Sequence, residues 1–238
     1  MSKVPLFIML FVFCDINNIS AQLLNNIYGE DRDDLLFHYG LLLGYNSMHS
    51  CINHSKSFYE KNDILSFLPD KQSSMDIGVS ATCKLNNKFE LRISPQVIIG
   101  ADKKFNMILE DSITGIKQYK QQVLPSTILQ IPLQLKLNSD RIGNFKMYLL
   151  AGVYYNYDFS WNASYRNKPE LIKLKKNDYG FQIGVGSTFY LPEVIISPEI
   201  KFDAGVLNTL SRNNANNYGQ YLSGIYSRMF ELSIHFEN

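Results

Sequence analysis

The sequence is poor in cysteine and tryptophan, and it has no excess of charge of either sign. Its 238 residues include 3 Cys and 1 Trp, and the formal net charge is +1. Such a balanced chain gives no electrostatic reason to expect binding of nucleic acid or a polybasic contact with a membrane surface. Beyond the N-terminus, no segment approaches about 18 uninterrupted apolar residues, which argues against a transmembrane helix. A membrane-spanning form would therefore be a closed β-barrel, because only helices and barrels satisfy every backbone polar group in lipid.

The N-terminus has the organisation of an export signal. Lys3 provides a short positive region, and the apolar residues 4–14 follow it. This stretch is shorter than the about 20 apolar residues that a helix needs to cross a bilayer. We predict cleavage after Ala21, so that residues 1–21 are a signal peptide and residues 22–34 form a periplasmic N-terminal segment.

The cysteines carry two further expectations for an exported chain. Cys14 suggests a lipoprotein as an alternative, although the bulky Phe13 stands where lipid attachment needs a small residue. Cys51 and Cys83 remain in the mature chain, and an exported pair invites a disulfide. The strand assignment below places them near opposite ends of neighbouring strands, whereas a disulfide needs Cα atoms within about 7 Å. We therefore predict two free thiols.

From about residue 35 to the C-terminus, apolar and polar residues alternate with the two-residue period of β-strands, and no helical period is sustained. In the first of these segments, Phe37, Tyr39 and Leu41 alternate with His38 and Gly40. The pattern predicts eight strands, near residues 35–48, 73–84, 89–99, 121–137, 145–160, 176–190, 194–202 and 230–236.

The expected connections alternate in length. Those at residues 86–87, 138–144 and 191–192 are short, and those after the first, third, fifth and seventh strands are longer and polar. Short periplasmic turns and long outer loops are typical of outer-membrane barrels, and an even strand number places both termini in the periplasm. We predict an all-β fold, an eight-stranded antiparallel transmembrane β-barrel of outer-membrane type over residues 35–238.

A soluble β-domain would show the same alternation, with its apolar faces in the core. Three features favour the barrel. Aromatic residues of the apolar face lie toward strand ends, where the interfacial girdle of a barrel would be, as do Tyr155, Tyr157 and Phe159. The polar faces are rich in glycine, which suits a crowded lumen, and the last strand carries the aromatic Phe236. We therefore predict the outer membrane of a Gram-negative bacterium as the location.

The expected inward faces carry charges of both signs. An eight-stranded barrel has an interior just wide enough for side chains, and unpaired charges there would be costly. We expect a polar and ionic plug, and the alternative is a polar conduit. The charged residues of this plug are Glu90, Arg92, Lys136, Glu199, Lys201 and Glu231.

The last strand permits two other functional interpretations. Arg228 falls on its apolar side near the outer interface, where it would contact a phosphate of outer-leaflet glycolipid or else turn inward. Glu231, Ser233 and His235 suggest a hydrolase, but next-but-one residues on a strand lie about 6.6 Å apart. A working Ser–His pair needs about 2.6–3.2 Å. We expect no catalytic residue, and no metal spacing or cofactor motif occurs.

Several short segments occur in an order and spacing that carry a family resemblance. The first is FHYGLLLGYNSM at residues 37–48. The others are IPLQLK (131–136), RIGNF (141–145), YLLAGV (148–153), DYGF (178–181), FYLP (189–192), SPEIK (197–201), SRM (227–229) and LSIHFE (232–237). Together they resemble the PorT/SprT family, small outer-membrane barrels of the type IX secretion and gliding apparatus of Bacteroidota. Lys146-Met147 departs from the Arg-Pro pair expected before Tyr148.

The resemblance implies a non-catalytic accessory of a machine that moves folded cargo with C-terminal signals across the outer membrane. So narrow a barrel cannot pass folded cargo itself, so the role would be assembly, scaffolding or gating of a larger translocon. The implied partners are other type IX secretion subunits of the outer membrane or periplasm, together with outer-membrane lipid. The alternatives are a generic small barrel, such as an adhesin or envelope stabiliser, and a lipid-modifying enzyme.

Overall fold

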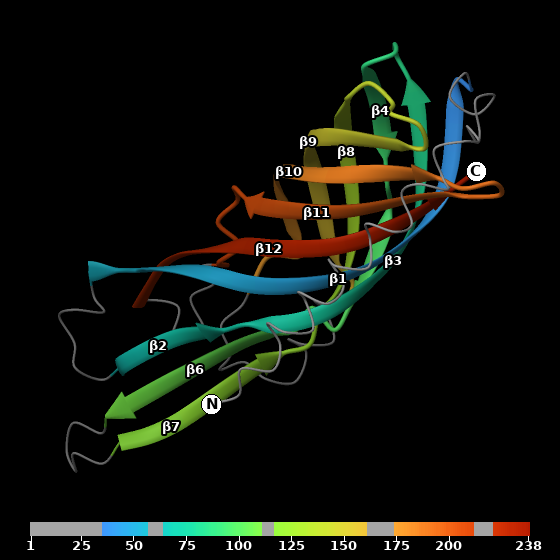
Figure 1. Cartoon of the computed structure of the whole chain (residues 1–238). Coiled ribbons are helices and arrows are strands. Elements are labelled where there is room, and N and C mark those ends of the chain that lie inside the picture. Colours follow the sequence, from blue (N-terminus) through green and yellow to red (C-terminus); the bar gives the residue numbers. More distant parts are fainter. Residues whose placement is uncertain (1–34, 57–63, 111–116, 161–173, 212–220) are drawn as a thin grey trace.

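The computed structural model describes residues 35–56, 64–110, 117–160, 174–211 and 221–238 (Figure 1). The predicted signal peptide and the N-terminal segment 22–34 lie outside these residues. The described chain forms β1 (Phe37–His54), β2 (Ile64–Asp70), β3 (Gln72–Lys84), β4 (Phe89–Ile93), β5 (Gln96–Ile99), β6 (Lys103–Glu110), β7 (Lys117–Leu124), β8 (Thr127–Asn138), β9 (Phe145–Asp158), β10 (Asn177–Tyr190), β11 (Ile195–Gly205) and β12 (Leu222–Glu237). No helix among the described residues is long and apolar enough to cross a membrane.

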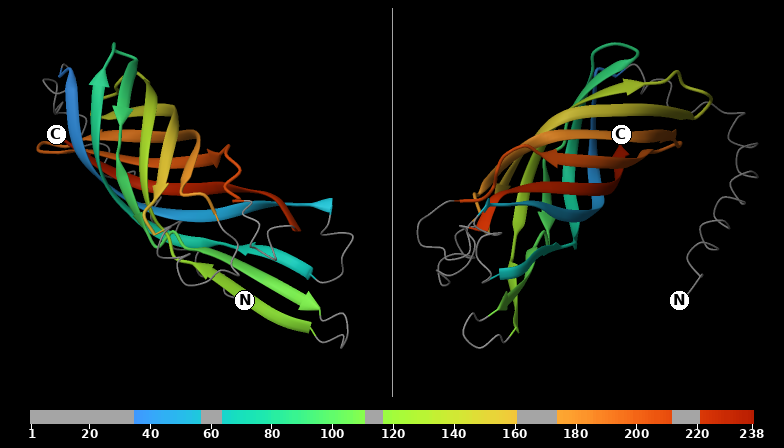
Figure 2. Two further views of the ribbon diagram at one scale, coloured as in Figure 1. Left: turned by 180° about the vertical axis from the view of Figure 1, so that it is seen from behind. Right: turned by 90° about the vertical axis from the view of Figure 1, so that its left-hand side faces the viewer.

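Nine strands form one antiparallel sheet that closes on itself. Its order is β1-β12-β11-β10-β9-β8-β4-β3-β5, with additional pairings of β1 with β3 and of β8 with β5. Because β4 and β5 follow one another between β3 and β8, the ring has eight strand positions. The pairing of β1 with both β12 and β3 closes the ring (Figure 2). This confirms the predicted eight-stranded antiparallel barrel.

The barrel is apolar outside and polar inside. Phe181 and Ile183 are 60% and 59% exposed on the outer surface, whereas Gln130 and Gln134 are fully buried. The same contrast follows the other strands of the ring, as in the burial patterns of β1 and β9. In a soluble β-sheet protein the apolar face would be the buried one. The alternation therefore belongs to a membrane barrel, and the soluble alternative is wrong.

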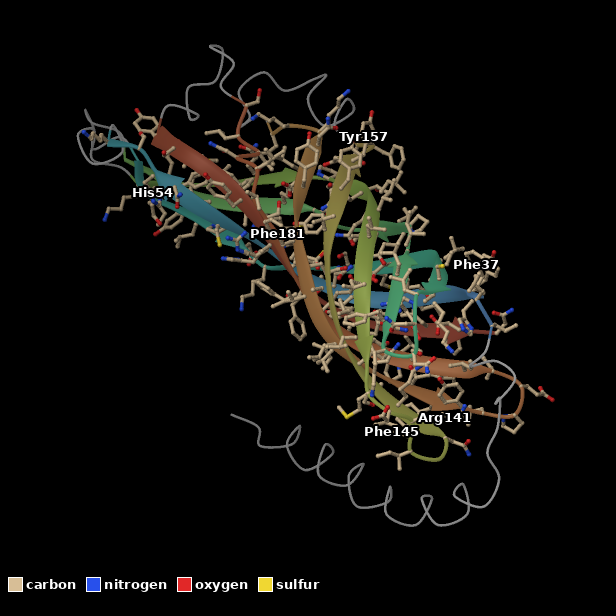
Figure 3. The ribbon with its side chains drawn as sticks, turned by 90° about the horizontal axis from the view of Figure 1, so that it is seen from above. Phe37, His54, Arg141, Phe145, Tyr157 and Phe181 are labelled. Carbon is tan, nitrogen blue, oxygen red and sulfur yellow. The ribbon has the colours of Figure 1, made fainter. Side chains whose placement is uncertain are left out.

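Aromatic side chains gather near both ends of the wall. Phe145 and Phe189 have ring centroids 5.2 Å apart at one end, and those of Tyr155 and Tyr179 are 5.7 Å apart toward the other. Phe145 and Tyr157 mark the two ends of β9 in Figure 3. Such girdles at both interfaces are typical of outer-membrane barrels.

The short connections share one end of the barrel. They lie between β3 and β4, between β8 and β9, and between β10 and β11. Short turns mark the periplasmic side of an outer-membrane barrel. We therefore assign this end to the periplasm and the opposite end to the cell exterior.

A second sheet projects beyond the ring at the outer end (Figure 1). It is three-stranded and antiparallel, in the order β2-β6-β7. Polar loops were predicted over most of this chain, so the prediction is wrong here. Phe105 and Met107 point to its inner face and are fully buried or nearly so, and they alternate with Lys104 and Asn106 as strand residues do.

Two predicted strands are interrupted by prolines. The segment predicted as 89–99 divides into β4 and β5 around Pro95, which has no N–H for the ladder, although its carbonyl accepts a hydrogen bond from Val79 N at 3.1 Å. The segment 121–137 divides into β7 and β8 around Pro125. In contrast, β1 and β12 extend further outward than predicted, to His54 and Leu222.

Cys51 and Cys83 are free, which confirms the prediction. Cys83 pairs with Phe37 across β3 and β1, whereas Cys51 lies toward the far end of β1, opposite Tyr226 of β12. The two thiols are thus kept apart by the length of the barrel wall.

Candidate functional site in the barrel lumen

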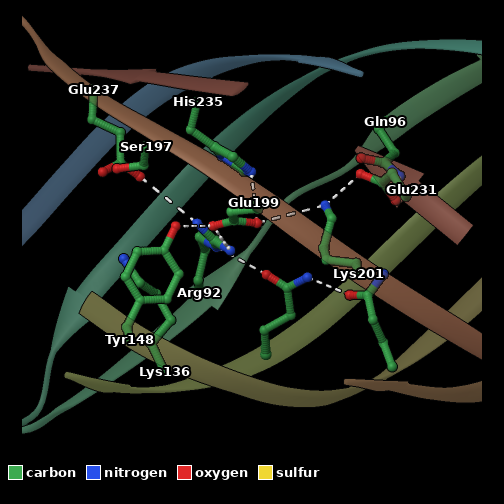
Figure 4. A network of polar contacts seen from close by, with 12 residues as sticks. Arg92, Gln96, Lys136, Tyr148, Ser197, Glu199, Lys201, Glu231, His235 and Glu237 are labelled. Carbon is green, nitrogen blue, oxygen red and sulfur yellow. Dashed lines mark hydrogen bonds and ion pairs between the residues drawn. The ribbon is translucent and has the colours of Figure 1, made fainter. Parts of the chain in front are cut away.

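Glu199 on β11 is the centre of the buried charges in the lumen (Figure 4). Its carboxylate lies 2.6 Å from Arg92 Nη2, 3.1 Å from His235 Nε2 and 3.7 Å from Lys201 Nζ. Tyr148 donates its hydroxyl hydrogen to the same carboxylate. These partners come from β4, β12, β11 and β9, so one buried side chain links four parts of the wall.

The contacts of Glu199 belong to a closed circuit of polar side chains, which we call the lumen circuit. From Arg92, Nε donates to Gln134 Oε1 at 2.8 Å, and Gln134 then donates to Gln182. Asp203 accepts hydrogen bonds from Gln182 at 2.6 Å and from Gln130 at 2.8 Å. The circuit therefore runs from β4 through β8 and β10 to β11.

The second half of the lumen circuit returns to Glu199. Gln96 on β5 donates to Gln130 at 2.5 Å and to Glu231 on β12 at 3.2 Å. Glu231 forms an ion pair with Lys201, which also faces Glu199. Because all these side chains are buried and are joined to one another by hydrogen bonds and ion pairs, the circuit connects opposite walls of the barrel.

A second charged cluster lies nearer the periplasmic end. Glu90 Oε2 lies 3.1 Å from Lys136 Nζ, and Glu90 Oε1 lies 3.3 Å from Lys146 Nζ. Lys136 Nζ also lies 4.3 Å from the centre of the Tyr148 ring, an attraction between cation and aromatic face. Tyr148 thus joins this cluster to the lumen circuit.

Two glycines of β10 make room for the lumen tyrosines. A Cβ atom at Gly186 would lie 2.6 Å from Cε2 of Tyr148, and one at Gly180 would lie 2.6 Å from Cζ of Tyr154. Each glycine is the direct cross-strand partner of its tyrosine on β9. The glycines on the polar faces therefore leave room for large side chains in a crowded interior, as the sequence indicated.

Apolar side chains close the lumen above the lumen circuit, on the outer side. Met48, Ile98, Ala101, Ile128 and Met229 form one buried cluster. A larger cluster beyond it joins the inner face of the outer sheet to β12 and to neighbouring segments. It comprises Phe67, Phe105, Met107, Leu124, Leu174, Leu210, Tyr221, Leu222 and Ile225. Apolar side chains thus cover the outer side of the lumen circuit, with an ion pair of Lys103 and Asp158 at 3.6 Å among the polar groups beside them.

A family model described as an outer membrane protein beta-barrel domain matches residues 21–211. The chain belongs to this family. It is therefore a β-barrel protein of the outer membrane, which confirms the predicted fold class and location.

Solved outer-membrane barrels are similar to the chain at low identity. OprG of Pseudomonas aeruginosa shares 13% identity at a TM-score of 0.47, over 84% of this chain and 95% of that one. Neisserial surface protein A shares 11% at 0.39, over 82% and 95%. The protease OmpT of Escherichia coli shares 9% at 0.47, over 84% and 95%. No protein of curated function matches the sequence. The family assignment rests on the family model and the strand topology.

The structure places every charged residue expected in the plug inside the outer-membrane barrel. Arg92, Glu199, Lys201 and Glu231 are in the lumen circuit, and Glu90 and Lys136 are in the periplasmic cluster. The other members were not predicted as part of the plug. They are Gln96, Gln130, Gln134, Tyr148, Gln182 and Asp203, together with His235, which the sequence had suggested only as part of a hydrolase. Their positions could have identified them, because each occupies one of the alternate positions that form the polar face of its strand.

Arg228 is half-buried at the outer part of β12. Its guanidinium donates to the carbonyl oxygens of Gly205 at 2.8 Å and Ser227 at 3.0 Å. On its strand it has the parity of the exposed Phe230 and Leu232. The backbone of the adjoining β11 thus holds part of this guanidinium, and contact with a glycolipid phosphate stays a prediction.

The serine and histidine of β12 are not arranged as a hydrolase. Both are buried, and His235 faces Glu199. Ser233 Oγ makes no hydrogen bond within the described part of the chain. Nor do the described residues hold three His, Cys, Asp or Glu side chains placed to bind a metal ion.

Proposed function

We propose that this outer-membrane barrel is a non-catalytic component of the type IX protein secretion and gliding machinery, of the PorT/SprT kind, which supports assembly or operation of the translocon. The observation that carries the proposal is the filled interior. The lumen circuit crosses the barrel, and the buried apolar cluster that includes Met48 and Ile128 lies on its outer side. A barrel without an open interior contributes through its outer surface and its two ends, as a scaffold does.

The family resemblance supplies the identity of the machine. The matching segments follow one another from residues 37–48 to residues 232–237, so they extend over most of the barrel. Several of them fall on strands whose inward residues form the lumen circuit, such as SPEIK on β11 with Glu199 and Lys201. The segments that carry the resemblance thus include part of the lumen circuit, such as Gln134, Glu199 and Lys201.

Deletion of the gene tests the proposal. In a clean deletion strain we expect cargo with type IX C-terminal signals to be lost from the medium and cell surface, and a plasmid copy to restore it. The matched control is complementation with Lys88→Met, which removes an exposed ion pair and leaves the interior intact. Unchanged cargo secretion in the deletion strain would refute the proposal.

The proposed partners are other outer-membrane or periplasmic subunits of that machine, together with outer-membrane lipid. Affinity purification from detergent-solubilised outer membranes should recover such subunits with the barrel. In planar bilayers the purified protein should give no steady ion-selective current, because the lumen circuit and the apolar clusters fill the described interior. A stable conductance would favour the conduit alternative.

A second candidate is a small barrel that acts through its outer end, as an adhesin or envelope stabiliser. The outer sheet favours it, since Tyr119 and Leu68 are 80% and 61% exposed there. Replacing residues 103–124 by a short Gly-Ser linker would remove β6 and β7. Loss of attachment with intact cargo secretion would support this candidate over the first.

A further inference from the structure

The apolar outer wall of the barrel ends in polar residues on three neighbouring strands, β3, β1 and β12 (Figure 1). On β12, Phe230 is exposed on the lipid-facing side, and Arg228 is the next residue on that side toward the cell exterior. On β1, the exposed Tyr45 is followed on its side by Ser47 and His49. Polar and charged groups therefore begin where the apolar band of these strands stops.

These polar residues lie beside one another. His49 is the direct cross-strand partner of Arg228, and Ser47 is the partner of Ser73 on β3. The Tyr45 hydroxyl donates to Ser73 Oγ at 2.6 Å. We call these five residues the outer polar patch. A guanidinium, an imidazole and three hydroxyl groups thus share one side of the wall near the outer interface.

Three other strands end differently on the lipid-facing side. The outer end of β9 carries Tyr155 and Tyr157, and that of β10 carries Tyr179. The exposed Val206 directly follows β11. Aromatic residues of this kind form the usual girdle of an outer-membrane barrel. The outer polar patch is therefore a local feature of β3, β1 and β12.

The guanidinium of Arg228 is held by the wall and retains donors for a ligand. Its Nη1 donates to the carbonyl oxygens of Gly205 and Ser227. Asp178, which is buried on the lumen side of β10, attracts the guanidinium from within. Nε and Nη2 donate to no acceptor in the described part of the chain. Phosphate suits these two donors, because a positioned guanidinium can give it paired hydrogen bonds.

An apolar groove of about 660 Å³ adjoins the patch on the lipid-facing wall. Tyr45 lines the groove as well as the patch, and Leu43, Val185, Leu232 and Ile234 line it further toward the periplasm. Leu232 is the cross-strand partner of Tyr45, so the groove begins directly on the membrane side of the patch. Its apolar lining suits an acyl chain.

We propose that the outer polar patch binds the phosphorylated sugar headgroup of an outer-leaflet glycolipid, with one acyl chain in the adjoining groove. The guanidinium of Arg228 binds the phosphate, and the three hydroxyl groups bind hydroxyl groups of the sugar. A phospholipid without a sugar would leave these hydroxyl groups without such partners. The proposal rests on the lipid contact in the proposed function and not on the secretion role, so a lipid-binding assay and the gene deletion test the two separately.

Native mass spectrometry of the full mature protein in non-ionic detergent micelles tests the site. The probe is diphosphorylated lipid A, and lipid A without its phosphates is the comparison. We expect Arg228→Gln to bind the probe about tenfold more weakly than the wild type, because a hydrogen bond between charged groups is lost. The matched control is Lys176→Gln, which removes a cation beside Tyr157 at the outer end of other strands. It should bind the probe as the wild type does.

Competition identifies the source of the phosphate. Inorganic phosphate and the deacylated, water-soluble headgroup should not displace the probe, and phosphatidylglycerol should displace it only at several-fold higher concentration. Displacement by inorganic phosphate or by the deacylated headgroup at the concentration of lipid A would overturn the assignment to a membrane lipid. Equal displacement by phosphatidylglycerol would overturn the assignment to a glycolipid.

Arginine modification of the wild-type protein gives a readout that needs no substitution. The reagent is phenylglyoxal, and mass spectrometry reports the rate at Arg228. In phosphatidylcholine vesicles that contain diphosphorylated lipid A, Arg228 should react several-fold more slowly than in vesicles with the dephosphorylated form. Equal rates in the two kinds of vesicle, or equal binding of the probe by the wild type and Arg228→Gln, would overturn the proposal.

Discussion

Replacing Arg92 by methionine should strongly destabilise the barrel. Arg92 is fully buried, and its guanidinium lies 2.6 Å from Glu199 and donates to Gln134 at 2.8 Å. Removing one partner of a buried ion pair costs about 3–5 kcal/mol, because the other charge stays buried without its compensation. Glu199 retains Lys201 and His235, so we expect a cost near 3 kcal/mol. That is about a hundredfold in the unfolding equilibrium.

The measurement is urea unfolding of protein folded into phospholipid vesicles, with the free energy taken from the transition. Lys88→Met is the matched control, since it breaks an exposed ion pair with Asp140, for which about 0–1 kcal/mol is usual. Adding Glu199→Gln to Arg92→Met should cost less than the sum of the two single changes, since the stranded carboxylate is then absent. An Arg92→Met barrel as stable as Lys88→Met would show that the lumen circuit does not support the fold.

Three further outcomes follow from the outer surface, the outer sheet and the thiols. Ile183→Lys places a charge on the lipid face of β10, where Ile183 is exposed. In the same urea assay it should lower the free energy of unfolding by about 2–4 kcal/mol if the residue lies near the midplane of the bilayer. An unchanged free energy would contradict contact with lipid. Phe105→Ala removes a buried ring from the outer cluster and should lower the stability of the outer sheet by about 3–5 kcal/mol. A protease should then cleave the outer sheet before it cleaves the barrel. Equal rates of cleavage in both parts would contradict a separate outer core. Cys51 and Cys83 should each take one alkyl group without prior reduction, and the intact mass should show both; an unmodified native protein that gains both labels only after reduction would reveal a disulfide.

The ring of the barrel could be predicted from the sequence because each face of each strand has a single environment. Phe181 and Ile183 face outward while Gln182 is buried inside, so the alternation is strict and its period is easily read. Strand ends were less predictable. The interruption at Pro95 follows from the missing N–H of proline, but the same alternation of buried and exposed residues continues from β4 to β5 and hides it.

The outer sheet was missed because it leaves the membrane. Outside lipid, the exposed face of a strand has no need to be apolar, so β7 carries Lys117, Gln118 and Gln121 and resembles a polar loop. The inner-face residues Phe105 and Met107 were the available signal. They occupy alternate positions, but only over a short segment.

The lumen circuit was predictable in its charges and not in its connections. Parity assigned Arg92 and Glu199 to the interior, but pairing between strands that are not neighbours depends on the tilt and register of the closed ring. The hydrogen bond from Gln130 to Asp203, which joins β8 and β11, is of this kind. No local pattern in the sequence records it.

The seam between β1 and β12 constrains how the protein reaches its membrane. It joins residues near the two ends of the barrel segment, from Gly40 opposite Glu237 to His54 opposite Leu222. The seam cannot form until both β1 and β12 have left the cytoplasm, because β12 lies at the far end of the barrel segment. Contacts so distant in sequence form slowly. During this time the apolar faces of the unpaired strands make the incompletely folded chain prone to aggregation. Until this seam closes, the edges of β1 and β12 remain open to pairing with other chains.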